Sequence, residues 1–190
     1  MKLNNFFKLV IAIGVSELAG VVGSFFTISA IPNWYSTLVK PALNPPSWVF
    51  GPVWTTLYAL MGISLFLVWK QHSNILQNVG MLRLWRWAIS LFFIQLILNT
   101  LWSIIFFGLH SPGGALIEIV FLWLAILATI VAFYKTSPPC ATAGASYGGT
   151  RSSSIWTTAG HGKLAAWLLV PYILWVSFAM YLNYTIWILN

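Results

Sequence analysis

Aromatic and amide side chains recur at helical spacing in three long apolar segments of the sequence. One segment places Trp54, Tyr58 and Met61 on a single helical face, since residues three or four positions apart share a face. A second segment has a face that carries Gln95, Asn99, Trp102, Ser103 and Phe106. A third has a face that carries Trp175, Ala179 and Asn183, with Phe178 and Leu182 beside them. Indole, phenol and phenyl rings with a few amides suit a flat, apolar, π-rich ligand. The stripes therefore predict a ligand cavity where the faces converge, although a single stripe of this kind is more often a packing surface.

Two carboxylates, Glu17 and Glu118, fall inside apolar segments. An ionisable side chain at bilayer depth costs about 2.5 kcal/mol or more, so it is expected to face the interior of a bundle or water. Neither carboxylate has a cationic partner within an apolar segment. Each is therefore interpreted either as a polar contact to a ligand or proton site, or as a protonated carboxyl that bonds a neighbouring helix.

Other kinds of chemistry lack the residues they need. The single cysteine, Cys140, excludes a CxxC metal or redox motif. The histidines His72, His110 and His161 all fall in predicted loops, so no apolar segment offers an axial imidazole to a haem. A Ser/His/Asp set, a phosphate-binding loop and a metal cluster are all missing from the sequence. We therefore predict no metal site and no required cofactor.

The composition indicates the environment of these segments. Of the 190 residues, 59% are hydrophobic and 6% are charged, whereas soluble domains contain about 25% charged residues. A soluble enzyme is therefore excluded, and so is a disordered chain, which requires low hydrophobicity and high charge. The nine basic residues are spread along the chain and form no nucleic-acid-binding patch. The sequence predicts a membrane protein in contact with lipid.

The membrane-spanning segments follow from the distribution of charge. A spanning helix needs about 20 mostly apolar residues, and five nearly uncharged runs lie at about residues 6–31, 48–69, 84–108, 113–134 and 164–189. The runs do not alternate in polarity, which excludes a transmembrane β-barrel. The first run is too long for a signal peptide and is interpreted as a retained helix. We predict an all-α, integral, multi-pass membrane protein, one domain over residues 1–190 that forms a bundle of five transmembrane helices.

The basic residues predict an orientation for this bundle. Eight of the nine lie at the N-terminus or in the second and fourth connections, and Lys40 in the first connection is the exception. Basic residues concentrate on the cytoplasmic side of membranes. The N-terminus is therefore expected inside and the C-terminus outside, in the cell membrane of a microbial source or an organelle membrane of a eukaryotic one.

Two connections differ from ordinary short loops. The first, IPNWYSTLVKPALNPPS, contains four prolines and the aromatic residues Trp34 and Tyr35, which favours a stiff lid over a site or an aromatic anchor at the interface. In the other, residues 136–163, Ser, Thr, Gly and Ala make up 19 of 28 residues. Such a segment buries too little apolar area to offset its ordering entropy. It is predicted to be a flexible linker.

Two further features concern the packing of the helices. Ala12, Ser16, Gly20 and Ser24 recur at intervals of four, which allows a close approach of a second helix. That helix belongs either to the same chain or to a second copy of it, so a homodimer is one of the two interpretations. Pro171 is expected to kink the last segment.

Long stretches of the sequence resemble the TspO/MBR family, whose members are also called translocator proteins, tryptophan-rich sensory proteins or peripheral-type benzodiazepine receptors. The stretches are WYSTLVKPALNPPSWVFGPVWTTLYALMG from Trp34, QLILNTLWSIIFFGL from Gln95, AWLLVPYILWVSFAMYLNYTIWILN from Ala166 and ELAGVVGSFFT from Glu17. The resemblance covers nearly the whole chain. It differs in the connection at 136–163, which is only a few residues long in typical members.

The resemblance implies a five-helix bundle that binds porphyrins and isoquinoline or benzodiazepine-type drugs under the first connection. Carried over residue by residue, it implies a pocket that includes Trp34, Tyr35, Leu38, Pro46, Trp54, Asn99, Trp102, Trp175 and Ala179. The helical faces add Tyr58, Phe178 and Asn183 to the predicted ligand-binding residues. Sterol binding is associated mainly with animal members of the family. The sterol-recognition pattern requires a lysine or arginine soon after a tyrosine of the last segment, and in this sequence none follows Tyr181 or Tyr184.

Two functions are consistent with these predictions. The first is a receptor or transporter that binds porphyrins or related flat hydrophobic ligands, with protoporphyrin-type tetrapyrroles as the expected ligand. The second is an enzyme that degrades bound porphyrin by oxidation or photo-oxidation, with Trp54 and Trp175 as candidate catalytic residues, because indoles can supply electrons to an excited ring. A scaffold or stress-interaction protein is a third alternative.

Overall fold

A computed structural model describes residues 4–72, 79–137 and 160–190, and in these ranges the chain is helical without strands. The helices are α1 (Asn5–Asn33), α2 (Ser47–Lys70), α4 (Val79–Ser103), α5 (Pro112–Lys135), α7 (His161–Leu168) and α8 (Val170–Leu189). A π-helical turn, η2 (Ile104–Gly108), continues α4, and a short 3-10 helix, η1 (Tyr35–Thr37), follows α1. When α4 is counted together with η2, and α7 together with α8, five helical segments are long and apolar enough to cross a membrane. The predicted five-helix membrane fold is confirmed.

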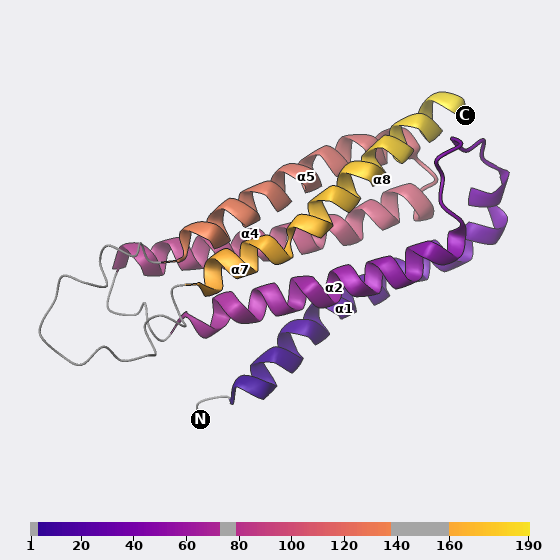
Figure 1. Ribbon diagram of the computed structural model, residues 1–190. Helices are drawn as coiled ribbons and strands as arrows, with labels where there is room; N and C mark the ends of the chain where they lie inside the picture. Colours follow the sequence, from indigo (N-terminus) through magenta and orange to yellow (C-terminus); the bar gives the residue numbers. More distant parts are fainter. Residues whose placement is uncertain (1–3, 73–78, 138–159) are drawn as a thin grey trace, which may run out of the picture.

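The helices run alongside one another and their ends gather at two ends of the bundle (Figure 1). One end holds the beginnings of α1, α4 and α7 and the ends of α2 and α5, and the opposite end holds the loop 34–46 and the C-terminus. The described basic residues of the first end are Lys8, Lys70, Arg83, Arg86, Lys135 and Lys163. The charge asymmetry behind the predicted orientation is therefore present in the fold, and the orientation itself stays a prediction.

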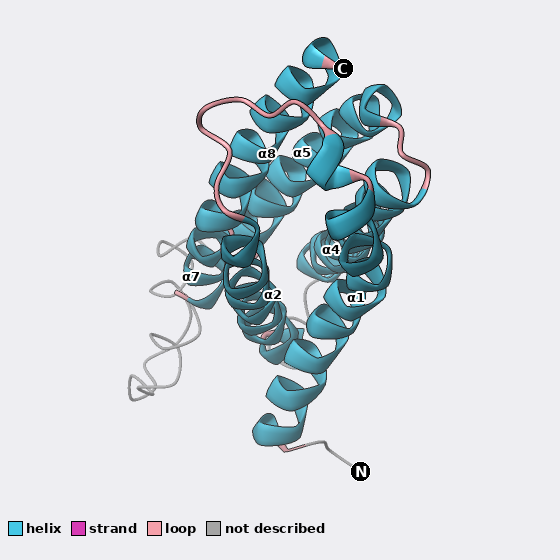
Figure 2. Ribbon diagram, turned by 90° about the vertical axis from the view of Figure 1, so that its right-hand side faces the viewer, coloured by secondary structure: helices cyan, strands magenta, loops and turns pink. Residues whose placement is uncertain are grey.

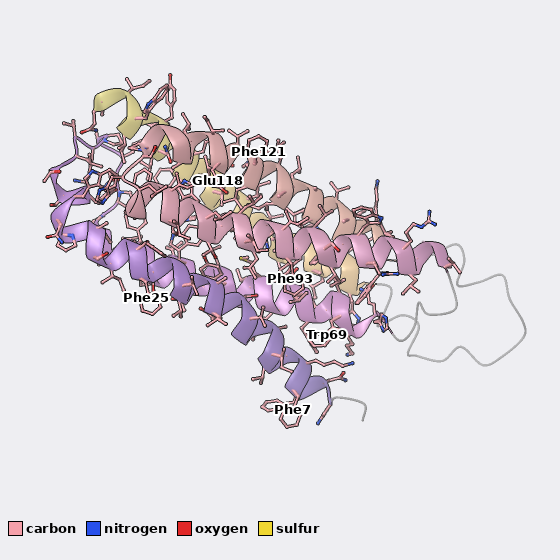
Figure 3. The ribbon with its side chains drawn as sticks, turned by 180° about the vertical axis from the view of Figure 1, so that it is seen from behind. Phe7, Phe25, Trp69, Phe93, Glu118 and Phe121 are labelled. Carbon is pink, nitrogen blue, oxygen red and sulfur yellow. The ribbon has the colours of Figure 1, made fainter. Side chains whose placement is uncertain are left out.

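The core lies where α2, α4, α5 and α8 meet. Met61, Phe92, Ile126 and Tyr172 are fully or almost fully buried there. The outward faces carry large apolar side chains, and Figure 3 shows Phe7 and Phe25 projecting from α1, where Phe25 is 71% exposed. Such a surface would favour aggregation in water, whereas it suits the lipid tails around a membrane bundle.

The small residues of α1 pack within the chain. Ala12 and Ser16 are fully buried, and Gly20 lies directly against the ring of Tyr58 on α2. A Cβ atom on Gly62 of α2 would lie 2.5 Å from the Cα atom of Ile13. The predicted close approach through small residues is thus an intramolecular contact between α1 and α2.

Local breaks and caps set the ends of several helices. Leu169 separates α7 from α8, and Pro171 follows in the first turn of α8, where its missing N–H costs nothing. The helical assignment is thus interrupted two residues before Pro171, where the sequence predicts a kink. At the start of α5, Ser111 Oγ accepts a hydrogen bond from the Gly114 amide over 3.3 Å, and Pro112 occupies the first turn.

The connection predicted at 136–163 begins where expected, after Lys135, and ends earlier than predicted, because α7 begins at His161. Thr136 and Ser137 are buried at the end of α5, and Ser137 Oγ accepts a hydrogen bond from the Lys163 amide over 3.0 Å. The helix α7 already begins at His161, so this histidine is helical and not part of a loop as predicted. Residues 138–159, on which the prediction of a flexible linker mainly falls, lie outside the described residues.

Candidate ligand-binding cavity

A cavity of about 450 Å³ lies between α1, α2, the end of α4 with η2, and α8. Its walls consist of Glu17, Gly20, Val21, Gly23, Ser24, Thr27, Ile28 and Ile31 from α1, Tyr35 from η1, Ser47, Trp48, Phe50, Gly51, Trp54, Thr55 and Tyr58 from α2, Trp102, Ser103, Phe106 and Phe107 from α4 and η2, and Trp175, Ala179, Leu182, Asn183 and Ile186 from α8. Sites for small molecules typically measure about 300–1,000 Å³. The volume therefore suits one organic ligand.

Aromatic rings form much of the wall and contact one another in pairs. The rings of Trp102 and Phe106 are stacked, with centroids 5.1 Å apart and planes 20° apart. Trp54 lies 5.6 Å from Tyr58, and Phe50 meets Trp175 edge-on at 6.2 Å. Ring pairs at these separations stabilise each other's positions. The wall is thus a rigid π-rich surface.

A chain of hydrogen bonds lies directly behind this wall. The Tyr58 hydroxyl donates to Asn99 Oδ1 over 2.5 Å, and Asn99 Nδ2 donates to the Tyr172 hydroxyl oxygen over 2.7 Å. Tyr58, Asn99 and Tyr172 come from α2, α4 and α8, so these two bonds connect three helices. Buried polar groups that are fully satisfied give a core a unique arrangement. This chain therefore fixes the position of Tyr58 at the cavity.

A second set of bonds fixes the α8 side of the cavity. Asn183 Nδ2 donates to the carbonyl oxygen of Pro112 over 2.7 Å, and Asn183 Oδ1 accepts from Trp102 Nε1 over 3.2 Å. The indole nitrogen of Trp175, by contrast, is buried and has no acceptor among the described residues. Trp175 therefore lines the cavity with its ring, while its Nε1 atom is buried away from the cavity surface.

The loop 34–46 covers one end of the cavity, and Figure 2 shows it arching over the end of the bundle. Asn190 clasps it through two bonds to Val39, with its side chain accepting from the amide over 2.9 Å and donating to the carbonyl over 3.1 Å. The Tyr35 hydroxyl donates to Asn44 Oδ1 over 2.7 Å. Burial raises the pKa of the Tyr35 phenol above its usual value, an effect that the Asn44 bond opposes in part. Tyr35 therefore stays a neutral donor.

A ring contact holds the loop from its other side. Trp34 stacks on His110, with centroids 4.5 Å apart, and meets Phe106 edge-on at 5.5 Å. His110 adopts a positive φ of 52°, an uncommon conformation for a residue with a side chain. The loop is thus pinned to α8 through Asn190 and to the connection after η2 through His110.

The cavity also reaches the outer surface of the bundle between α1 and α2. Several of its lining residues are exposed to the outside, among them Val21 and Ile28 on α1 and Trp48, Gly51 and Thr55 on α2. Both helices are long and apolar enough to cross a membrane. A hydrophobic ligand dissolved in the bilayer could enter there.

Comparison with known proteins assigns the family. The sequence profile described as the TspO/MBR family matches residues 12–188, which is nearly the whole chain. The chain belongs to the TspO/MBR family. It is therefore an integral multi-pass membrane protein, and the resemblance seen in the sequence is confirmed.

Relatives from bacteria, archaea and animals share this TspO/MBR membership. The chain is 41% identical to tryptophan-rich protein TspO of Chlorobaculum tepidum, covering 96% of this chain and 95% of the relative. It is 37% identical to tryptophan-rich protein TspO of Archaeoglobus fulgidus, covering 98% and 99%. It is also 36% identical to the human translocator protein, covering 90% of this chain and 83% of the relative.

The structure places the predicted site residues of this TspO/MBR protein in two groups. Those that line the cavity are Tyr35, Trp54, Tyr58, Trp102, Trp175, Ala179 and Asn183. The remaining five, Trp34, Leu38, Pro46, Asn99 and Phe178, lie behind or beside the wall. Trp34 and Leu38 pack under the loop, Asn99 holds Tyr58 and Tyr172, Pro46 precedes α2, and Phe178 contacts the Trp175 ring at 5.7 Å.

Sequence reasoning considered Glu17 as a possible ligand contact and missed the rest of the wall that α1 contributes. Glu17, Ser24 and Thr27 line the cavity, whereas Glu118 does not and lies between α5 and α4 (Figure 3). Both oxygens of Glu118 and both amide atoms of Gln95 are buried without a partner among the described residues. A usable signal was present, because Glu17, Gly20, Ser24 and Thr27 recur every three or four residues and form a polar stripe on one helical face.

Proposed function

We propose that this TspO/MBR protein is a membrane receptor or transporter that binds protoporphyrin-type tetrapyrroles and related flat hydrophobic molecules. The observation that carries the proposal is the 450 Å³ cavity with its stacked and edge-on aromatic rings. Ring faces bind flat π-systems by offset stacking and edge contacts.

Individual residues take separate roles in this proposal. Trp54, Trp102 and Trp175 supply the ring faces that hold the ligand plane. Tyr35 and the loop 34–46 close the cavity at the end of the bundle, while the opening between α1 and α2 admits the ligand from lipid.

A specific contact favours the alternative function, oxidative breakdown of the bound tetrapyrrole. The ring of Trp54 lies in the cavity wall and is 5.6 Å from Tyr58 and 6.3 Å from Tyr172. An excited tetrapyrrole would take one electron from the Trp54 indole and pass it to dioxygen, and the superoxide formed would add to the ring. The electron that the ring–oxygen adduct then gives up would refill the hole on Trp54, which Tyr58 and Tyr172 can share, so dioxygen is the net oxidant of the ring.

One titration series tests both functions. Protoporphyrin is titrated into the purified protein in the dark, and the absorbance of the complex is then followed under light. Trp175→Phe replaces the indole by a smaller aromatic ring, so we expect affinity to fall by about threefold to tenfold, as a lost ring contact of about 0.5–1.5 kcal/mol implies.

Trp123→Phe is the matched control, because Trp123 donates to Ser177 Oγ over 2.9 Å and does not line the cavity. If Trp175→Phe and Trp54→Phe titrate like the wild type, these residues are not in the binding site. An illuminated complex that returns only intact protoporphyrin eliminates the breakdown reaction and leaves binding as the function.

A further inference from the structure

The charges around the cavity have one sign. Nine of its 25 lining residues are aromatic, and the face of an aromatic ring carries partial negative charge. Glu17 is the single carboxylate in the lining, and the lining contains no lysine, arginine or histidine among the described residues. A ring-walled cavity with one carboxylate favours a cation over a neutral molecule of the same shape.

On the α1 wall of the cavity, the side chain of Glu17 is a hydrogen-bond acceptor to which no described residue donates. The neighbouring hydroxyls bond their own helix, Ser24 to the carbonyl of Val21 over 2.7 Å and Thr27 to the carbonyl of Gly23 over 3.2 Å. The Glu17 carboxylate makes no hydrogen bond or ion pair with the described residues. It is half-buried, so water screens it only in part.

The basic residue at this end of the bundle is engaged elsewhere. The Lys40 ammonium donates to the carbonyl oxygens of Ser36 and Leu38 and lies over the Tyr35 ring, 4.8 Å from its centroid. Lys40 does not line the cavity. It therefore offers no ion pair to the Glu17 carboxyl group.

We propose that the cavity also binds flat aromatic cations and that Glu17 is the residue that selects them. The positive ring system lies against the indole faces of Trp54 and Trp175, and its N–H edge donates to the Glu17 carboxylate. The inference rests on the same cavity as the proposed function and adds a second ligand class to it. It further implies that a tetrapyrrole binds with its carboxylates pointing away from Glu17.

The test compares two ligands of the same shape in the full-length protein. The cation is 9-aminoacridine, which is protonated at neutral pH, and the neutral counterpart is acridine. Both are titrated by fluorescence into protein in nanodiscs of zwitterionic phosphatidylcholine, since anionic lipid would itself concentrate the cation. We expect the wild type to bind the cation about tenfold more tightly than acridine, as charge-assisted bonding and cation–π contact predict.

The two acidic residues of the chain supply a matched pair of variants. Glu17→Gln should weaken binding of the cation about tenfold and leave acridine within about twofold, whereas Glu118→Gln, which removes a carboxylate outside the cavity, should change neither. Glu17→Asp should retain most of the preference. If Glu17→Gln does not fold, the preference measured on the wild type alone still decides.

Equal affinity of the wild type for both ligands would overturn the inference, and so would a preference that survives Glu17→Gln. A separate protoporphyrin titration distinguishes this failure from that of the proposed function. Protoporphyrin binding without binding of the cation removes only the present inference. Binding of the cation without protoporphyrin removes the proposed tetrapyrrole ligand and retains the role of Glu17.

Discussion

The hydroxyl of Tyr58 donates to Oδ1 of Asn99 over 2.5 Å, so a residue of the cavity wall is anchored from behind by a residue that does not line the cavity. Asn99 is bonded in turn to Tyr172. The amide therefore has a partner on each side, and both partners are aromatic side chains of other helices. This arrangement explains how one polar residue in the middle of α4 holds the shape of an otherwise apolar cavity.

Removing the Tyr58 hydroxyl should destabilise the bundle measurably. Tyr58→Phe leaves Asn99 Oδ1 without its donor, and interhelical hydrogen bonds in membranes contribute about 0.6–2 kcal/mol. We expect a lower midpoint in an SDS unfolding titration, and less than additive loss in Tyr58→Phe/Asn99→Leu, since the two residues share one bond. Tyr184→Phe is the control, because this tyrosine is exposed and makes no hydrogen bond with the described residues. An unchanged midpoint for Tyr58→Phe would contradict the prediction.

Gly62 should tolerate no larger side chain. A Cβ atom there would lie 2.5 Å from the Ile13 Cα atom, which is backbone and moves only with the whole of α1. We expect Gly62→Ala to cost about 1–3 kcal/mol through overpacking, read out as a lower melting temperature in detergent. Gly14→Ala serves as the control, because nothing lies within 4 Å of its Cβ position. Equal melting temperatures for the two variants would show that α1 and α2 are not in this contact.

The clasp between Asn190 and Val39 should control the mobility of the loop 34–46. Asn190→Ala removes both side-chain bonds to Val39. A hydrogen bond contributes about 0.5–1.5 kcal/mol, so the Val39 amide is expected to exchange its hydrogen several-fold faster and the bound ligand to dissociate faster. Asn33→Ala is the comparison, since Asn33 bonds only the carbonyl of Ser29 in its own helix. Exchange at Val39 that does not change would mean that the loop is held by other contacts.

Filling the opening between α1 and α2 should slow ligand entry. A Cβ atom on Gly51 meets nothing within 4 Å, and Gly51 lines the cavity at its lipid-facing edge. Gly51→Trp therefore places an indole in the opening without a backbone clash, and we expect the association rate of protoporphyrin to fall at least about tenfold in stopped-flow measurements. Gly51→Ala should associate at the wild-type rate. Equal rates for Gly51→Trp and the wild type would move the entrance to another part of the cavity.

The sequence predicts the helices well because an uncharged, apolar run of about 20 residues rarely forms anything other than a membrane-spanning helix. Its errors lie at the ends. The predicted start of the third span excludes Arg83, whereas α4 begins at Val79 and continues through Arg83 and Arg86, whose side chains are exposed. A basic side chain at the end of a spanning helix can extend toward water while its backbone stays helical. A hydropathy argument therefore ends a span too early at such residues.

The site was only partly predictable, for a geometric reason. Helical spacing identifies a face, and on α8 it correctly places Trp175, Ala179 and Asn183 along the cavity, while Phe178 falls to one side. Spacing does not distinguish a residue that faces a ligand from one that faces a partner helix. Asn99 has the chemistry of a ligand contact, and its two tyrosine partners, far away in sequence, turn it into a support.

The π-helical turn at Ile104–Gly108 makes the number of residues in this part of the chain as important as their identities. Each residue of an α-helix advances the side-chain direction by about 100°, and a π-helical turn holds one residue more than an α-helical turn. Deleting one residue there would let α4 continue as an ordinary α-helix and would rotate everything after it. Phe106 would lose its ring contacts with Trp102 and Trp34, and the loop 34–46 would lose the contact that Trp34 makes with η2. The number of residues in this turn is therefore more strictly constrained than their types. Relatives should differ here by substitution rather than by insertion or deletion.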